Sequence, residues 1–325
     1  MTPSPLKALY KEKDDSKITT GIYIRPPQIN QKDIRNTPSV LINIHDSAFM
    51  LGNSRMVSIP QIQDCLSRNW VVVVPNHCLC PGVNILEGPV EDCWGLLALV
   101  YEGILEEFLR DQGSTWVGGY DVSKPPKAIL GFYGAVHFTH AFWTTPLPHV
   151  GEKLPSGSAP EFINQVYGEY PVLTDSSISL EGQAESGRAM GPDFWRPRDA
   201  FAFTQIANGR VLSACFPGRD VREIDLICHI GEGFPATCIV HGIEDQMVPI
   251  SLSRELVKVL REKEVDCGMV EVPGEDHTFA MEMEVGSRTW EVHKRLMSVE
   301  ATGLKIKNSV HANMYTQYTP SPSQC

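Results

Sequence analysis

Five short apolar runs stand out along the chain, each bounded by polar or turn-forming residues. They span residues 39–44, 70–74, 127–133, 236–240 and 267–272. Short apolar runs of this kind are typical of parallel strands that are buried on both faces of a sheet. Stretches with helical spacing lie between several of them, so the pattern predicts an α/β protein with a mostly parallel sheet.

Four further stretches have the apolar spacing or the boundary residues of helices. Residues 54–68 suit a helix, and residues 89–110 carry an apolar stripe after a proline that is tolerated in a first turn. A helix is expected over residues 251–263 with Ser251 as its N-cap. A last helix is expected over residues 285–297.

The ends of the chain are more polar than its middle. Residues 1–14 are expected to be loose, and residues 17–24 alternate enough to form an edge strand. Residues 198–215 predict one amphipathic helix. Residues 301–325 are polar and predict a disordered tail.

Length and charge narrow the class of protein. A chain of 325 residues holds one large α/β domain with an insertion, or two domains. A net charge of −11 argues against nucleic acid and against a basic membrane-binding patch. No apolar run reaches the roughly 18 residues of a membrane-spanning helix. Because a signal-peptide core and a peroxisomal C-terminal tripeptide are also lacking, we expect an intracellular, cytoplasmic protein.

The cysteine pattern bears on redox state and metal binding. Nine cysteines, an odd number at irregular spacing, favour reduced thiols over a disulfide framework. His77, Cys78 and Cys80 lie close together, but a Cys-x-Cys pair alone is a weak signal for zinc. We therefore expect no metal and no cofactor.

The residues that suggest catalysis follow two of the predicted strands. Asp245 lies just past the run at 236–240, and His277 just past the run at 267–272. An acid and then a histidine form the second half of a Ser…Asp…His triad in the chain order of α/β-hydrolases. The carboxylate of such a triad fixes the tautomer and tilt of the imidazole that moves the proton. The alternative is two surface-loop residues with no shared role.

Residues 45–52, 128–145 and 236–279 together carry a resemblance to a known family. There the chain resembles α/β-hydrolases of the hormone-sensitive-lipase and esterase type, and it is similar to prolyl-oligopeptidase-like hydrolases of fungal secondary-metabolite and toxin clusters. The resemblance covers most of residues 15–300. It implies a doubly wound sheet with a lid. The implied parts are residues 1–135 as the N-terminal part of the core, 136–235 as the lid or cap, 236–300 as the C-terminal part of the core with the acid and histidine loops, and 301–325 as the tail.

The first of these stretches corresponds to the loop that forms the oxyanion hole in the family. The family reads His-Gly-Gly-Gly-Phe there, whereas this chain reads His45-Asp46-Ser47-Ala48-Phe49. The resemblance implies an oxyanion loop at His45, Ser47 and Ala48, with backbone N–H donors at the last two. The three glycines, which relieve the steric limits on the backbone angles of such a loop, are replaced here by residues with side chains. Asp46 would also place a negative charge near the developing oxyanion.

The nucleophile of the family has no counterpart. Between the helix that ends near residue 110 and the strand at 127, the family places a strand, a Gly-x-Ser-x-Gly turn and a helix. The roughly 15 residues present here are too few, since a parallel crossover alone takes about a dozen. Ser114 and Ser123 lack flanking glycines, and Tyr133, in Gly-Phe-Tyr-Gly-Ala, is not placed at the elbow.

If one central strand–helix unit is missing, the strand at 39–44 is expected to pair with that at 127–133. Asp245 and His277 would then move toward the oxyanion loop by about one strand spacing, ~4.8 Å.

Three functions remain open. The first is hydrolysis of an acyl ester, thioester or amide, such as a polyketide-type metabolite, by attack that Asp245 and His277 assist. The second is a catalytically silent binder or a lyase that uses His277 as a general base. The third is a defective copy of the first that has lost an exon-sized piece. The expected lid offers Trp143, Phe194 and Trp195 as walls of a substrate pocket, or alternatively as core of the lid.

Overall fold

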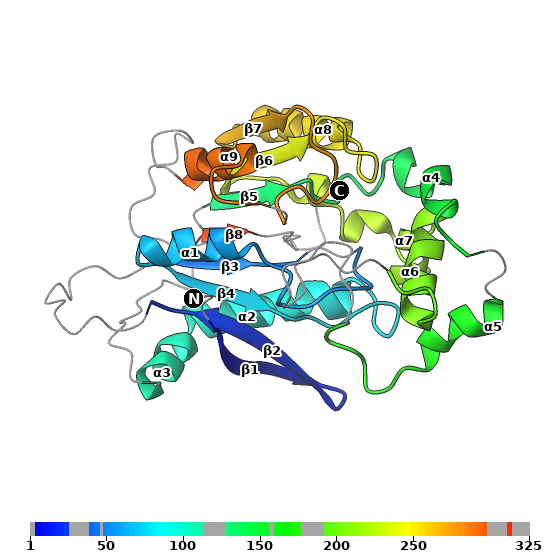
Figure 1. Ribbon diagram of the computed structural model, residues 1–325, viewed down its shortest axis with the longest axis horizontal. Coiled ribbons are helices and arrows are strands. Elements are labelled where there is room, and N and C mark those ends of the chain that lie inside the picture. Colours follow the sequence, from blue (N-terminus) through cyan, green and yellow to red (C-terminus); the bar gives the residue numbers. More distant parts are fainter. Residues whose placement is uncertain are drawn as a thin grey trace, which may run out of the picture.

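The computed structural model describes a mixed α/β protein (Figure 1). The described residues are 4–25, 39–45, 48–112, 126, 128–155, 159–176, 192–281, 283–297 and 311–313. The strands are β1 (Leu6–Lys13), β2 (Ser16–Tyr23), β3 (Val40–Asn43), β4 (Val71–Pro75), β5 (Ala128–Phe132), β6 (Ala236–Gly242), β7 (Cys267–Val272) and β8 (His311–Asn313). They lie in the order β1-β2-β4-β3-β8-β5-β6-β7.

The sheet consists of two halves that β8 joins. One half, β1-β2-β4-β3, contains the antiparallel pairs, and the other, β5-β6-β7, is parallel. Between them, β8 pairs in parallel with β3, where Ile42 lies opposite Ala312, and with β5, where Ile129 lies opposite Ala312 (Figure 1). The single doubly wound sheet that we expected is therefore present only in part.

The predicted pairing of the strands at 39–44 and 127–133 is wrong, because β8 lies between them. Two bare strand edges present backbone N–H and C=O groups that need partners, and a strand placed between them serves both. The expected shift of Asp245 and His277 by one strand spacing depended on that pairing, so its basis is removed. Residues 311–313 also differ from the disordered tail that we expected; the other residues after 297 lie outside the described part.

The hairpin β1–β2 is a second difference from the sequence-based picture. Residues 6–13 form a strand instead of a loose segment, so β2 is not at the edge. The hairpin turn lies at Asp14 and Asp15, which adopt left-handed backbone angles (φ 46° and 64°). Aspartate tolerates this conformation, which tight hairpin turns require.

The helices largely follow the predicted spacing, with corrections at their ends. They are α1 (Ile59–Ser67), α2 (Glu91–Tyr101), α3 (Ile104–Asp111), α4 (Pro148–Gly151), α5 (Pro160–Ile163), α6 (Pro197–Ala207), α7 (Val211–Cys215), α8 (Ile250–Glu262) and α9 (Arg288–Met297). Gly103, with φ 80°, divides the helix expected over 89–110 into α2 and α3. The helix expected over 198–215 is likewise two helices, α6 and α7. Ser251 is not an N-cap, because α8 begins directly after Pro249.

Helices cover both faces of each half of the sheet. Leu41 and Val72 pack into a cluster with α1, whereas their neighbours Ile42 and Val73 pack with α2 and α3. In the other half, Ile239 packs toward α8 on one face. On the opposite face, Val240 and Val272 belong to a cluster that includes α9. This alternation follows from the two-residue period of a strand.

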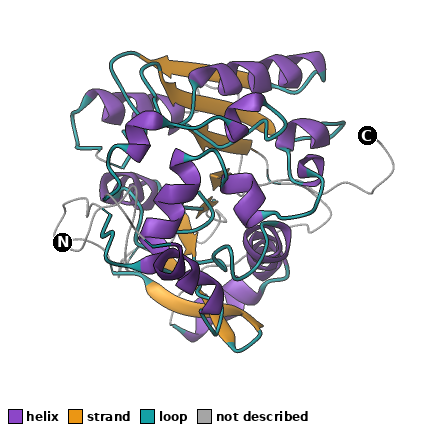
Figure 2. Cartoon of the chain, turned by 90° about the vertical axis from the view of Figure 1, so that its right-hand side faces the viewer, coloured by secondary structure: helices purple, strands orange, loops and turns teal. Residues whose placement is uncertain are grey.

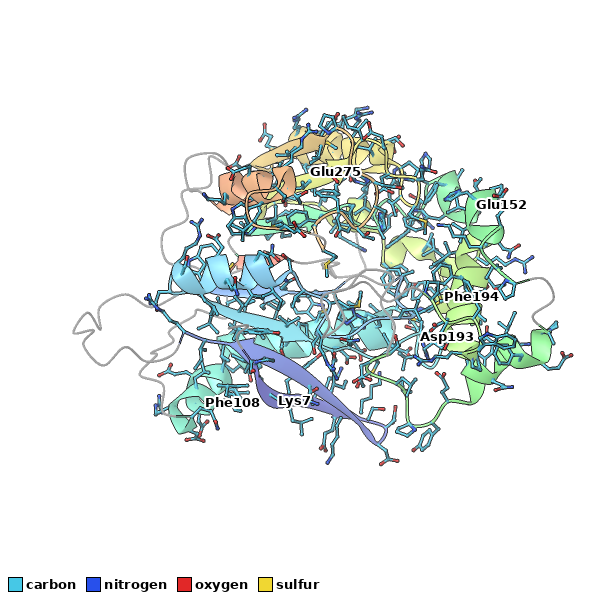
Figure 3. The ribbon with its side chains drawn as sticks, in the orientation of Figure 1. Lys7, Phe108, Glu152, Asp193, Phe194 and Glu275 are labelled. Carbon is cyan, nitrogen blue, oxygen red and sulfur yellow. The ribbon has the colours of Figure 1, made fainter. Side chains whose placement is uncertain are left out.

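Helices α4 to α7 gather at one end of the molecule, to the right of the sheet in Figure 1 and toward the viewer in Figure 2. Phe201 and Phe216 are fully buried among them. Trp143 is buried in the same cluster, and Phe194, labelled in Figure 3, packs partly buried against it. Trp195 is 91% exposed, so it does not form a pocket wall in this structure.

Candidate functional site

The loop after β6 holds the candidate acid by its own backbone. The Asp245 carboxylate is fully buried, and its Oδ1 accepts hydrogen bonds from the backbone N–H groups of Met247 and Val248, both at 2.8 Å. Because these donors belong to the same loop, the local sequence is sufficient to fix the direction of the side chain.

The loop after β7 lies directly against the acid loop. The backbone N–H of Glu244 donates to the carbonyl of Glu275 at 3.2 Å, and Figure 3 labels Glu275 on the β7 side of the molecule. A Cβ atom added to Gly242 would lie 2.2 Å from that same carbonyl oxygen. Glycine at position 242 is therefore what allows the two loops to approach each other this closely.

The structure brings the two predicted residues together. His277 Nδ1 lies 2.7 Å from Asp245 Oδ2, with 12% of the His277 side chain exposed. Since the carboxylate only accepts, Nδ1 carries the proton and donates it, which leaves Nε2 as the basic nitrogen. This is the arrangement of the acid and the base in a triad.

A second histidine, which sequence reasoning left without a role, also contacts the acid. His241, at the end of β6, is fully buried, and its Nε2 lies 3.0 Å from Asp245 Oδ2 and 2.8 Å from the carbonyl of Val248. Its Nδ1 lies 2.7 Å from the hydroxyl of Ser253 on α8. With the proton on Nε2, His241 donates toward Asp245 and accepts from Ser253. The four-residue spacing between His241 and Asp245 was the available signal.

These contacts determine the ionisation of the acid. Burial raises the pKa of Asp245, but hydrogen bonds from His241 and His277 and the nearby imidazole charge outweigh it, so the pKa lies well below its usual value. Asp245 is thus ionised at neutral pH.

Tyr133 forms one side of the histidine site. It directly follows β5 with a left-handed φ of 36°, and its ring centroid lies 4.9 Å from that of His277 at an interplanar angle of 59°. Its backbone N–H donates to the carbonyl of Val240 at 2.8 Å. The β5 end and the β7 loop therefore meet at His277.

The expected oxyanion loop is described in part. His45 is buried and stacks on His77, with ring centroids 4.5 Å apart and an interplanar angle of 15°. Asp46 and Ser47 lie outside the described residues. Ala48 has a left-handed φ of 51°, and the following Phe49 one of 66°.

A buried guanidinium fastens the far end of this loop. Arg198 on α6 donates from Nη1 to the carbonyls of Met50 and Cys80, both at 2.7 Å, and from Nε to Glu169 at 3.0 Å. Helix α6 is thereby connected to the loops after β3 and β4 through one side chain.

The predicted lack of a nucleophile concerns residues outside the described part. Ser114, Ser123 and the remainder of residues 113–125 are not described, so the missing elbow stays a prediction. Burial raises the pKa of the thiols of Cys65, Cys78 and Cys93 to about 12, so these three are protonated at neutral pH. Protonated thiols are poor nucleophiles.

The described residues show neither a metal-binding cluster nor a membrane-spanning helix. No group of three or more His, Cys, Asp or Glu side chains in the described ranges is arranged to hold a metal ion. No helix within those ranges has the length and apolar character needed to cross a membrane.

The sequence has distant relatives among fungal enzymes. It is 25% identical over 327 residues to the non-reducing polyketide synthase prhL of Penicillium brasilianum, which covers 84% of this chain and 13% of the synthase. It is 24% identical over 321 residues to the non-reducing polyketide synthase Preu6 of Preussia isomera, covering 87% of this chain and 14% of that protein. The chain thus spans a small part of these relatives. No protein-family model matches it.

The fold has counterparts among solved structures. A Staphylococcus aureus protein of unknown function superposes with a TM-score of 0.61 at 15% identity, covering 93% of this chain and 100% of the other. Esterase 2 of Thermogutta terrifontis, solved as its sarin-phosphonylated form, gives a TM-score of 0.53 at 17% identity, with 94% and 98% coverage. The chain therefore has an α/β-hydrolase-like fold that resembles bacterial esterases, together with distant similarity to a segment of fungal non-reducing polyketide synthases.

Proposed function

We propose that this chain is an esterase- or thioesterase-like hydrolase that acts on an acyl ester or thioester of polyketide type, with Asp245 and His277 as its acid–base pair. The observation that carries the proposal is the 2.7 Å contact between His277 Nδ1 and the ionised Asp245. The similarity to polyketide synthases supports the substrate class.

The pair performs general-base catalysis in this proposal. Asp245 holds the proton of His277 on Nδ1, so Nε2 takes a proton from a water molecule as the water oxygen adds to the acyl carbon. The same imidazolium then returns the proton to the departing alkoxide or thiolate, and the products are a carboxylic acid and an alcohol or thiol. Backbone N–H groups at Ser47 and Ala48 would stabilise the oxyanion between these steps.

Residues 136–235 serve as the lid in this proposal, between core parts at 1–135 and 236–300. The position of α4 to α7 at one end of the sheet supports this division (Figure 1). The bonds from Arg198 to Met50 and Cys80 connect the lid to the oxyanion loop.

The second candidate is a catalytically silent binder, or a lyase in which His277 takes a proton from carbon. What favours it is the three-residue strand β8, which stands between β3 and β5, where the related hydrolases carry the strand that ends in the nucleophile. A protein of this kind binds an acyl ligand without hydrolysing it.

The deciding experiment combines turnover with covalent labelling. Hydrolysis of an N-acetylcysteamine thioester is measured for the full chain and for His277→Ala, and intact mass is recorded after treatment with a fluorophosphonate. The proposal expects hydrolysis that falls by about 10²-fold or more in the variant, with no mass adduct. An adduct would reveal a covalent nucleophile and overturn direct water attack. Equal rates, or no turnover in either protein, would overturn hydrolysis at His277.

A further inference from the structure

Two histidines converge on one oxygen atom of the candidate acid. His277 Nδ1 lies 2.7 Å from Asp245 Oδ2, and His241 Nε2 lies 3.0 Å from the same atom. The other oxygen, Oδ1, accepts from the backbone N–H groups of Met247 and Val248. An oxygen that two donors share is a weaker partner for each of them than an oxygen that serves one. His241 therefore bears directly on the bond between Asp245 and His277.

The contacts of His241 determine which of its nitrogens carries the proton. Nε2 faces two acceptors, Asp245 Oδ2 and the carbonyl of Val248 at 2.8 Å, so this nitrogen is the donor. Nδ1 lies 2.7 Å from the hydroxyl of Ser253, which is 1% exposed and donates to it. Because donation to one ring nitrogen polarises the N–H at the other, Ser253 strengthens the bond from His241 to Asp245.

A charged pair on two neighbouring elements also acts on His241. Glu271 lies opposite His241 in the pairing of β6 with β7. Its carboxylate accepts hydrogen bonds from Arg254 of α8 at 2.9 and 2.8 Å. Both side chains are partly exposed to solvent, so their opposite charges largely cancel at His241.

The groups around His277 are engaged with the backbone or contact it through an aromatic ring. Asp276 Oδ1 accepts from the backbone N–H of His277 itself at 2.7 Å. The carboxylate of Glu244 accepts from a backbone N–H of the loop after β7 at 2.6 Å. From β5, Tyr133 packs its ring against that of His277. The hydrogen bond to the His277 ring thus comes from Asp245, the carboxylate that His241 also contacts.

We propose that His241 is a positioning residue that sets the basicity of His277 by sharing Asp245 Oδ2 with it. The shared oxygen stabilises the His277 imidazolium less than an oxygen reserved for that ring, so His277 stays neutral, and able to accept a proton, down to a lower pH. The consequence for turnover rests on the proposed hydrolysis, whereas the effect on the titration of His277 does not.

The titration of His277 tests the proposal directly. Its ring signals, assigned by comparison with His277→Ala, are followed by NMR against pH in the wild type, in His241→Leu and in His241→Gln. The midpoint is expected to rise by about one pH unit in His241→Leu, because Asp245 then gives Oδ2 to His277 alone. His241→Gln retains an N–H donor and is expected to restore most of the wild-type midpoint. An unchanged or lowered midpoint in His241→Leu, or equal midpoints in the two variants, would overturn the proposal.

The matched control is His293→Leu. His293 of α9 is another buried histidine that contacts a carboxylate, with its Nε2 3.2 Å from Asp64 Oδ2 of α1. Its loss is expected to lower stability without moving the midpoint of His277. A rise as large as that of His241→Leu would show that the effect is not specific to the shared oxygen, and would overturn the proposal.

Ser253→Ala gives an answer if His241→Leu does not fold. This variant removes the donor to His241 Nδ1 and leaves the contacts of Asp245 in place. The midpoint of His277 is expected to rise by about a third of the shift expected for His241→Leu. A midpoint equal to that of the wild type would overturn the proposal.

Thioester turnover gives the second readout. The ratio of kcat/KM at pH 6 to that at pH 9 is expected to fall by about tenfold in His241→Leu, since a higher midpoint leaves less neutral His277 at low pH. A fall of equal size at both pH values would mean that His241 only supports the fold, which would overturn the proposal. Absence of turnover in the wild type would overturn the proposed hydrolysis, and the NMR titration would still decide the role of His241.

Discussion

The pair β6–β7 and the junction of β3 with β5 carry the two halves of the candidate site, and their construction differs. Six residue pairs, from Thr237–Cys267 to Gly242–Val272, connect β6 to β7 without interruption. At the junction, β8 makes three pairs with β3 and two with β5. Asp245 and His277 follow the first arrangement, and the expected oxyanion loop and Tyr133 follow the second.

The difference shows how the contact between Asp245 and His277 is held beside a sheet centre that only a three-residue strand bridges. Asp245 takes its contacts from its own loop, from His241 and from the β7 loop, all on one side of β5. None of these bonds crosses the junction. A change at the junction is therefore expected to reach the pair through the packing of β5, and not through a lost partner.

The largest effect is expected from Asp245→Asn, which changes the half of the candidate site that follows β6 and β7. Both carboxylate oxygens accept from two donors, so either orientation of an amide turns N–H groups toward other donors. We expect a loss of about 3 kcal/mol in the free energy of unfolding and about 10³-fold in any hydrolysis. Urea denaturation and thioester turnover measure the two quantities.

The same variant is expected to change how the free energy of unfolding depends on pH. Because the folded pKa of Asp245 is lowered, its stabilisation is complete above the unfolded pKa of about 4 and is lost as pH falls through the folded value. The stability of the wild type is thus expected to fall below about pH 4 more steeply than that of Asp245→Asn. The control is Glu232→Gln, an exposed carboxylate. Parallel pH profiles for Asp245→Asn and the wild type would contradict the assigned ionisation.

The next largest effect is expected at the junction, from Ala312→Pro. Ala312 lies opposite both Ile42 and Ile129, and proline removes its N–H and does not fit inside a central strand. We expect a loss of about 3 kcal/mol, with increased hydrogen exchange of the β3 and β5 amides and unchanged exchange at β7. Ala312→Ser retains the N–H and is the matched control. Equal stability of the two variants would show that β8 does not hold the halves together.

The same contrast explains what the sequence predicts well. Asp245 and His277 each follow an apolar run directly, and the ends of parallel strands meet at one edge of a sheet, so their proximity follows from local pattern. Predicting this contact required no information about residues far away along the chain. His241 was overlooked because a histidine inside a strand resembles any other strand residue until its partner is known.

Long-range features were not accessible in this way. Residues 311–313 have no period and no strand-forming composition, and only the two free edges of β3 and β5 select them as a strand. The guanidinium of Arg198 meets the carbonyls of Met50 and Cys80, which are more than 100 residues away along the chain. No sequence pattern near residue 198 predicts these two partners.

Arg198→Met tests how the expected oxyanion loop is held in place, and a smaller effect is expected. The substitution retains the apolar stem but removes the donors to Met50 and Cys80 and leaves Glu169 without this partner. We expect a loss of about 2 kcal/mol and faster proteolysis in residues 48–56. Arg222→Met, at an exposed pair with Asp220, is the control and is expected to change neither quantity. A loss of the same size in the control would show that charge, and not the buried bonds, matters.

The smallest effect is expected to be a gain, from Ala48→Gly. Ala48 holds a left-handed φ of 51° in a loop where the hydrolases that the sequence resembles have glycine, and this conformation costs a non-glycine residue roughly 1–2 kcal/mol. Glycine removes that cost but adds about 0.4–1 kcal/mol of unfolded-chain entropy. The net result is a gain of about 0.5 kcal/mol, measured by urea denaturation. The control is Ala98→Gly inside α2, where the backbone is helical and a loss of about 1 kcal/mol is expected.

Opposite signs for these two glycine variants would place the strain in the loop after β3, on the junction side of the molecule. Equal losses of stability in the two variants would mean that the backbone of Ala48 is not strained. In that case the alanine at position 48 would have no structural cost, and the contrast between the two halves of the candidate site would reduce to the three-residue strand β8.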